Sequence, residues 1–205
     1  MNLFKYEITI LSFMVFVLLS GCASPPLKDA ILRSPEFQAE PLNKVTFLPV
    51  IDSRLDREID VDLDGQIREP IIENLEDKGY VVIVSNDGDA ISGITEEDLK
   101  SGDPMIIKQL SSSSSTRRIL VVQLIDVSTD LTFGSTGVAE VAGFAYDQGL
   151  EKMIWRDKGI GKSGQGGLIG MMMISSMDNA AISAAILNLM ASIPEYKAEK
   201  NVSSK

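Results

Sequence analysis

A strand, a helix and a second strand follow one another between residues 44 and 84, and this segment constrains the fold more than any other. Residues 44–51 (KVTFLPVI) are apolar and rich in β-branched side chains, which predicts a strand near the centre of a sheet, ending near its proline. Apolar residues then recur every four positions and predict one buried helix stripe: Leu63, Ile67, Ile71 and Leu75. Pro70 predicts a kink or a restart in this helix, and Gly79 predicts its end. Because residues 80–84 form another apolar strand, the segment predicts a parallel β-α-β unit.

The later part of the chain adds further helices and strands. The predicted elements are a helix opened by residues 95–98, a helix at 104–110, a strand at 119–127, an antiparallel pair at 136–146 and 152–159, and a helix from Asp178 to Ile193 with Pro194 after it. The resulting order is β-α-β-α-β-β-β-α. It predicts an α/β or α+β fold in which helices pack on a single mixed sheet.

The amino-terminal region carries a processing signal. An apolar run at residues 8–19 is about a dozen residues long, too short to cross a bilayer as a helix. It ends in Leu19-Ser20-Gly21-Cys22, the pattern at which bacterial lipoproteins are processed, and Cys22 is the only cysteine of the chain. In that pathway the thiol of Cys22 takes a diacylglycerol, the chain is cut before it, and the new amino terminus is acylated. We therefore expect a signal peptide at 1–21, a lipidated tether at 22–43, a globular domain at 44–194 and a polar tail at 195–205.

The tether is expected to be semi-extended because it contains Pro25, Pro26, Pro35 and Pro41. At most a short helical turn is expected in it, near residues 29–33. Residue 23 is Ala rather than the Asp that retains enteric lipoproteins in the inner membrane, which favours the outer membrane.

Charge and composition exclude several functional classes. The formal net charge is −10, which argues against a nucleic-acid partner because phosphate backbones are negatively charged. The chain contains no histidine, so Ser-His-Asp and Cys-His nucleophiles and most zinc sites are excluded.

Alternating acids at Asp60, Asp62 and Asp64, followed by Gly65, match the start of a calcium-binding loop. The twelfth position of such a loop is a bidentate Glu, and here it is Ile71. The competing interpretation is that Asp62 or Asp64 caps the following helix while the other acids face solvent. Calcium is therefore a weak candidate, and no other cofactor is expected apart from the acyl chains on Cys22.

Residues 159–164 (GIGKSG) match a glycine-rich nucleotide motif, but no helix follows directly, which argues against nucleotide binding. The apolar run after these glycines suits either core packing or a partner surface. Its candidate interaction residues are Leu168, Ile169, Met171, Met172 and Met173. An enzymatic interpretation depends on carboxylates alone, with Asp52, Asp56 and Glu140 as candidates.

Four segments give the chain a resemblance to a family of outer-membrane lipoproteins of the neisserial surface-antigen type. They are KVTFLPVIDSR (44–54), LDGQIREPIIENLEDKGY (63–80), DLTFGSTGVAEVAGFAYD (130–147) and IWRDKGIGKSGQGGLIGMMM (154–173). The opening β-α-β unit is more distantly similar to the N-terminal domain of TolB, the curli-secretion lipoprotein and the lipoprotein activators of peptidoglycan synthases. The resemblance implies an α/β sandwich that works by protein–protein contact at the cell envelope, and it supplies no catalytic residues.

The function expected from these observations is that of a non-enzymatic lipoprotein, acting as an adaptor or accessory factor in envelope assembly or export. The membrane is contacted through the lipid, and the protein acts as a monomer or a homodimer on an envelope partner that the sequence does not name. The domain would lie in the periplasm or at the cell surface. The alternatives are a subunit of an oligomeric secretion complex or pore, and a carboxylate-based envelope hydrolase.

Overall fold

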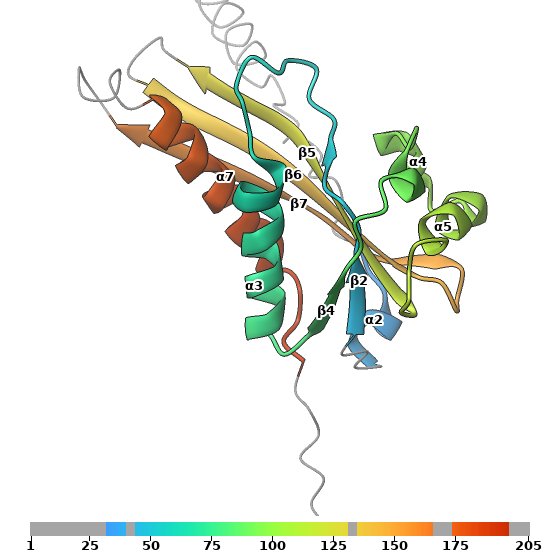
Figure 1. Ribbon diagram of the computed structural model, residues 1–205. Helices are drawn as coiled ribbons and strands as arrows, with labels where there is room; N and C mark the ends of the chain where they lie inside the picture. Colours follow the sequence, from blue (N-terminus) through green and yellow to red (C-terminus); the bar gives the residue numbers. More distant parts are fainter. Residues whose placement is uncertain (1–31, 40–43, 131–134, 166–173, 197–205) are drawn as a thin grey trace, which may run out of the picture. The chain divides into compact units, whose positions relative to one another are not determined.

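One mixed sheet of seven strands organises the protein (Figure 1). The computed structural model describes residues 32–39, 44–130, 135–165 and 174–196. The strands are β1 (Leu32–Arg33), β2 (Lys44–Phe47), β3 (Ile51–Asp52), β4 (Val81–Val84), β5 (Arg118–Asp130), β6 (Ser135–Asp147) and β7 (Lys152–Gln165). Their order across the sheet is β1-β7-β6-β5-β2-β4, and β3 also pairs with β5. The helices in these residues are α2 (Pro35–Ala39), α3 (Glu69–Asp77), α4 (Glu96–Ser101), α5 (Pro104–Ser111) and α7 (Ile174–Met190). The predicted fold class is confirmed as α+β.

The β2-α3-β4 segment forms the predicted parallel unit, with Lys44 opposite Val81 and Phe47 opposite Val84. The predicted first strand is interrupted around Pro49, so that β3 continues it separately. A wide helical turn (η1, Leu63–Arg68) precedes α3, and Pro70 lies in the first turn of α3 as a restart of the helix requires. Gly79 has a φ of +88°, the left-handed conformation in which helices end.

The strands β5, β6 and β7 form a long antiparallel meander. The predicted strand at 152–159 is longer than expected, because β7 continues through the glycine-rich motif to Gln165. Gly159 and Gly161 lie in β7 opposite Val141 and Ala139 of β6. The motif therefore belongs to a strand, and its glycines have a packing role.

That role is to admit α7 against the sheet. A Cβ atom at Gly159 would lie 2.0 Å from the carbonyl oxygen of Ala185, and one at Gly161 would lie 1.9 Å from that of Ala181. Real Cβ contacts of this kind exceed 3 Å, so only glycine lets the helix backbone lie this close to the strand. The strand side of this contact therefore requires glycine at both positions.

Helices cover both faces of the sheet. On one face α3 and α7 pack over a core that includes Phe47, Leu124 and Trp155. On the other face α4 and α5 cover a second core around Phe144 and Tyr146. In Figure 1 the two helix pairs lie on opposite sides of the strands.

Helix α7 begins earlier than predicted. Asp178 lies inside the helix rather than at its cap, is 4% exposed, and accepts a hydrogen bond from Thr129 Oγ1 of β5 at 2.8 Å. The predicted buried face is confirmed at Ile182, Ile186 and Met190, each 1% exposed. The helix ends at Met190, three residues before the predicted end, and Ile193 is buried beyond it.

The segment predicted as a tether differs most from expectation. Leu32 and Arg33 form β1 against Arg156 and Trp155 of β7, where at most a helical turn was expected. The following helix, α2, places Phe37 on Trp155 with ring centroids 6.3 Å apart. The described fold therefore includes residues 32–39, ahead of the predicted boundary at Lys44, because Phe37 gains a buried aromatic partner in strand β7.

Candidate functional site

A pocket opens at the carboxyl ends of the parallel strands β2 and β4, where ligands bind in open α/β sheets. Its volume is about 730 Å³. Its lining combines apolar walls with two acids, a buried arginine and an amide: Pro49, Val50, Val61, Asp62, Leu63, Asp64, Arg68 and Asn86. Two of the candidate catalytic acids lie where the chain leads from β3 to this pocket: Asp52 at the end of β3 and Asp56 in the loop after it.

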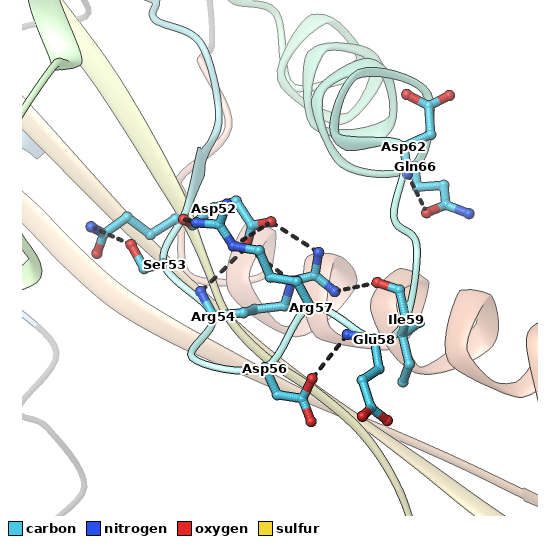
Figure 2. A network of polar contacts seen from close by, with 10 residues as sticks. Asp52, Ser53, Arg54, Asp56, Arg57, Glu58, Ile59, Asp62 and Gln66 are labelled. Carbon is cyan, nitrogen blue, oxygen red and sulfur yellow. Dashed lines mark hydrogen bonds and ion pairs between the residues drawn. The ribbon is translucent and has the colours of Figure 1, made fainter.

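A bidentate ion pair holds that loop in place (Figure 2). Asp52, at the end of β3, accepts hydrogen bonds from Nε and Nη2 of Arg54, both at 2.9 Å. Arg54 also donates from Nη1 to the carbonyl oxygen of Ile59 at 2.7 Å. These charge-assisted bonds from Arg54 hold the pKa of Asp52 below its usual range. Asp52 is thus an ionised structural anchor for the turn that leads toward Asp60.

The other two candidate catalytic acids have partners of their own. Asp56 accepts a hydrogen bond from the backbone N–H of Glu58 at 2.9 Å. Glu140, on β6, pairs with Lys158 of β7 at 2.6 Å. Asp52, Asp56 and Glu140 are thus each engaged by a different partner, namely Arg54, the backbone N–H of Glu58 and Lys158.

The acidic stretch of the calcium hypothesis has a capping role at Asp62. Its side chain accepts from the backbone N–H of Gly65 at 3.0 Å, while its own N–H donates to Oε1 of Gln66 at 3.1 Å. Asp64 pairs with Arg68 at 3.1 Å, and Asp60 is solvent-exposed. Within the described residues, no three Asp, Glu or Cys side chains gather as a metal site requires. The capping interpretation of Asp62 is confirmed.

Arg68 is the pocket residue that the sequence did not single out. It is 8% exposed and donates from Nη1 to Asp64, and from Nη2 to the carbonyl oxygen of Ser85 and to Oδ1 of Asn86 at 3.0 Å. It thereby ties the start of α3 to the chain that leaves β4. Arg68 follows Ile67, which belongs to the predicted apolar stripe of the helix. The position of a charged residue next to that stripe was the one feature of the sequence that could have indicated a buried arginine.

Two sets of predicted site residues lie outside the described residues. They are the lipidation site Cys22 and the interaction candidates Leu168, Ile169, Met171, Met172 and Met173. In the part of the chain that is described, no helix combines the length and the apolar character needed to cross a bilayer.

Neither a protein-family model nor a curated protein matches the sequence. Among solved structures, the chain is similar to lipoprotein GNA1162 from Neisseria meningitidis, with 15% identity and a TM-score of 0.41 over 66% of this chain and 95% of that one. It is also similar to the PelC dodecamer from Paraburkholderia phytofirmans, with 13% identity and a TM-score of 0.46 over 82% and 97%. A minor lipoprotein from Acinetobacter baumannii aligns with 8% identity and a TM-score of 0.38 over 77% and 98%. Two of these three solved structures are described as lipoproteins.

Proposed function

We propose that this protein is a bacterial lipoprotein anchored through Cys22, and that its domain acts by contact with other envelope proteins. The observation that carries the proposal is the Leu19-Ser20-Gly21-Cys22 pattern at the end of a short apolar run. The thiol of Cys22 carries the diacylglycerol, and the amino group of Cys22 is acylated after cleavage. Ala23 directs the lipoprotein to the outer membrane.

The way in which the chain enters the domain supports an anchoring role. Beyond β1, the ion pair between Lys152 and Glu36 at 2.7 Å fastens α2 to the start of β7. Arg118 donates from Nη2 to the carbonyl oxygen of Glu36 at 3.0 Å and lies over the ring of Phe37, 5.5 Å from its centroid. These contacts place ordered structure at residues 32–39, which begin ten residues after Cys22 in the sequence.

Action by contact agrees with the chemistry of the described acids. The candidate catalytic carboxylates are each held by a separate partner, and Asp62 caps a helix. We therefore assign the protein an adaptor or accessory role in envelope assembly or export rather than a hydrolytic one.

The proposal is tested in cells with Cys22→Ala beside the natural chain. We expect the variant to remain a longer precursor that takes up no labelled palmitate. Normal processing of the variant would overturn the anchor.

The adaptor role is tested separately, by cross-linking the lipidated protein in cells and identifying the products by mass spectrometry. A discrete foreign protein is the expected product. A ladder that contains only multiples of this chain would contradict the adaptor role and favour an oligomeric complex.

A further inference from the structure

Strand β4 is the last strand on one side of the described sheet. It pairs with β2 on one side, and no other strand of the described residues pairs with it. In Figure 1 it lies at the outer side of β2, beside α3. An open edge offers backbone donors and acceptors to any extended chain that comes alongside.

The backbone groups that face outward can be assigned. The N–H of Ser85 donates to the carbonyl oxygen of Phe47 at 2.9 Å, so the backbone of Ser85 faces β2. Backbone groups of successive residues in a strand point to opposite sides. Ile83 therefore also faces β2, and the N–H and C=O groups of Val82 and Val84 point away from it.

The side chains of β4 do not protect this edge. Natural edges are usually shielded by a charge, a proline or a bulge, whereas β4 has the sequence VVIV and pairs with β2 without a register shift. Its side chains remain exposed by 47% at Val81, 38% at Ile83 and 43% at Val84. Apolar side chains are thus available on both faces of the strand, since Val81 and Ile83 lie on one face and Val84 on the other.

One stripe of helix α3, which ends in an exposed acid, lies beside the same edge. Gln66 bonds to Asn179 of α7, whereas Arg68 bonds to Ser85 and Asn86 just after β4, so the stripe that continues from Arg68 faces β4. At helical spacing that stripe contains Ile72 and Glu76. Ile72 is partly buried in the core, and Glu76 is exposed.

The charge of this helix selects the kind of chain that can bind. The exposed residues of α3 are all acidic: Glu69, Glu73, Glu76 and Asp77. Antiparallel pairing of β4 with a second copy would place two such helices on the same face of a continuous sheet, where their charges repel. A basic segment is attracted to the same place.

We propose that the free edge of β4 binds an extended segment of a partner protein in which apolar and basic residues alternate, added to the sheet as a further strand. Main-chain bonds to Val82 and Val84 supply affinity, and the acids of α3 select the basic residues. The inference rests on the proposed function, since it names the surface and the chemistry of the partner.

The probe is a fluorescent eight-residue peptide of alternating Lys and Val, titrated by anisotropy into the full lipidated protein in micelles of an uncharged detergent. Empty micelles supply the background. We expect saturable binding, and at least about tenfold weaker binding of a matched Glu and Val peptide, because like charges repel. Equal binding of both peptides, or no binding of the Lys and Val peptide, would overturn the proposal.

Two edge variants and one control locate the site. Val84→Pro removes an outward N–H without touching the bonds to β2, and Val84→Lys adds a repelling charge. Each is expected to weaken binding at least about tenfold. Leu150→Lys changes a side chain of equal exposure (42%) in the turn before β7, and binding is expected to stay within about twofold. Binding unchanged in Val84→Lys would refute the site even if Val84→Pro does not fold.

Light scattering tests the competing occupant. A dimer of the natural protein that Val84→Lys converts to monomer would show that a second copy covers the edge, and it would overturn the proposal. Because the peptide assay uses purified protein, it can fail while cross-linking in cells still finds a discrete partner. That combination would refute the β4 site and leave the proposed function standing.

Discussion

The contact between β7 and α7 gives the sharpest prediction about the fold, through Gly161→Ala. The new methyl group would meet the carbonyl oxygen of Ala181 at 1.9 Å and the backbone nitrogen of Ala185 at 2.3 Å. An ordinary contact begins near 3.4 Å, so α7 would have to retreat by about 1.5 Å. Neither atom belongs to a side chain that can rotate away.

The loss of stability can be estimated from the packing contacts that this movement of α7 would break. Ile182, Ile186 and Leu189 are each 1% exposed or less, and all three would separate from the sheet with the helix. A gap of even 0.5–1 Å forfeits about a quarter to a half of a dispersion contact. Overpacking usually costs about 1–3 kcal/mol, and here the clash is with backbone, so we expect a loss of about 3 kcal/mol or more.

Urea unfolding followed by tryptophan fluorescence measures this loss, since Trp155 is the only tryptophan and is fully buried. At about 2 kcal/mol per molar, the midpoint is expected to fall by about 1.5 M. Gly88→Ala is the matched control, because a Cβ atom there meets nothing within 4 Å and its φ is −71°. We expect the control to stay within about 1 kcal/mol of the natural chain. Equal stability of the two variants would refute the close approach of α7 to β7.

Two further predictions concern the segment before β2. Phe37→Ala removes a ring that is 7% exposed and stacked on Trp155. We expect it to lower the free energy of unfolding by about 3 kcal/mol, measured by thermal unfolding followed by circular dichroism. A loss below about 0.5 kcal/mol would show that residues 32–39 belong to the tether and not to the fold. The hydrogen bond from Lys152 lowers the pKa of Glu36 from 4.5 to about 2. Because the pKa is lower in the folded state, the pair stabilises the fold above the unfolded pKa, and its contribution is lost as the pH falls toward 2. Glu36→Gln is therefore expected to reduce the acid-induced fall in urea-unfolding free energy between about pH 5 and pH 2; identical pH profiles would show that the pair contributes nothing.

The elements that the sequence predicted well are those with a strong local signal. The apolar period of residues 63–75 identified the helix. Residues 95–98 were expected to open a helix, and Thr95 and Asp98 form a reciprocal cap where α4 begins. The cap at Asp62 was also one of the two interpretations of the acidic stretch. In each case the deciding contacts lie within a few residues along the chain.

The elements that were missed depend on contacts between distant residues. The predicted strand ended at Gly159, and only the approach of α7 explains why the strand continues through Gly161 to Gln165. The prolines around Phe37 predicted an extended tether, and its packing on Trp155 could not be predicted because the two residues are far apart in the sequence. The sequence alone could not place Arg68 in the pocket, because its partners Ser85 and Asn86 follow strand β4, about 17 residues further along the chain.

The most direct measurement of the central claim is the mass of the amino-terminal peptide of the protein purified from bacterial envelopes. We predict a mature chain that begins at Cys22 and carries a diacylglyceryl group on the thiol and an acyl chain on the amino group. A chain that retains Met1, or a free thiol at Cys22, would contradict the account.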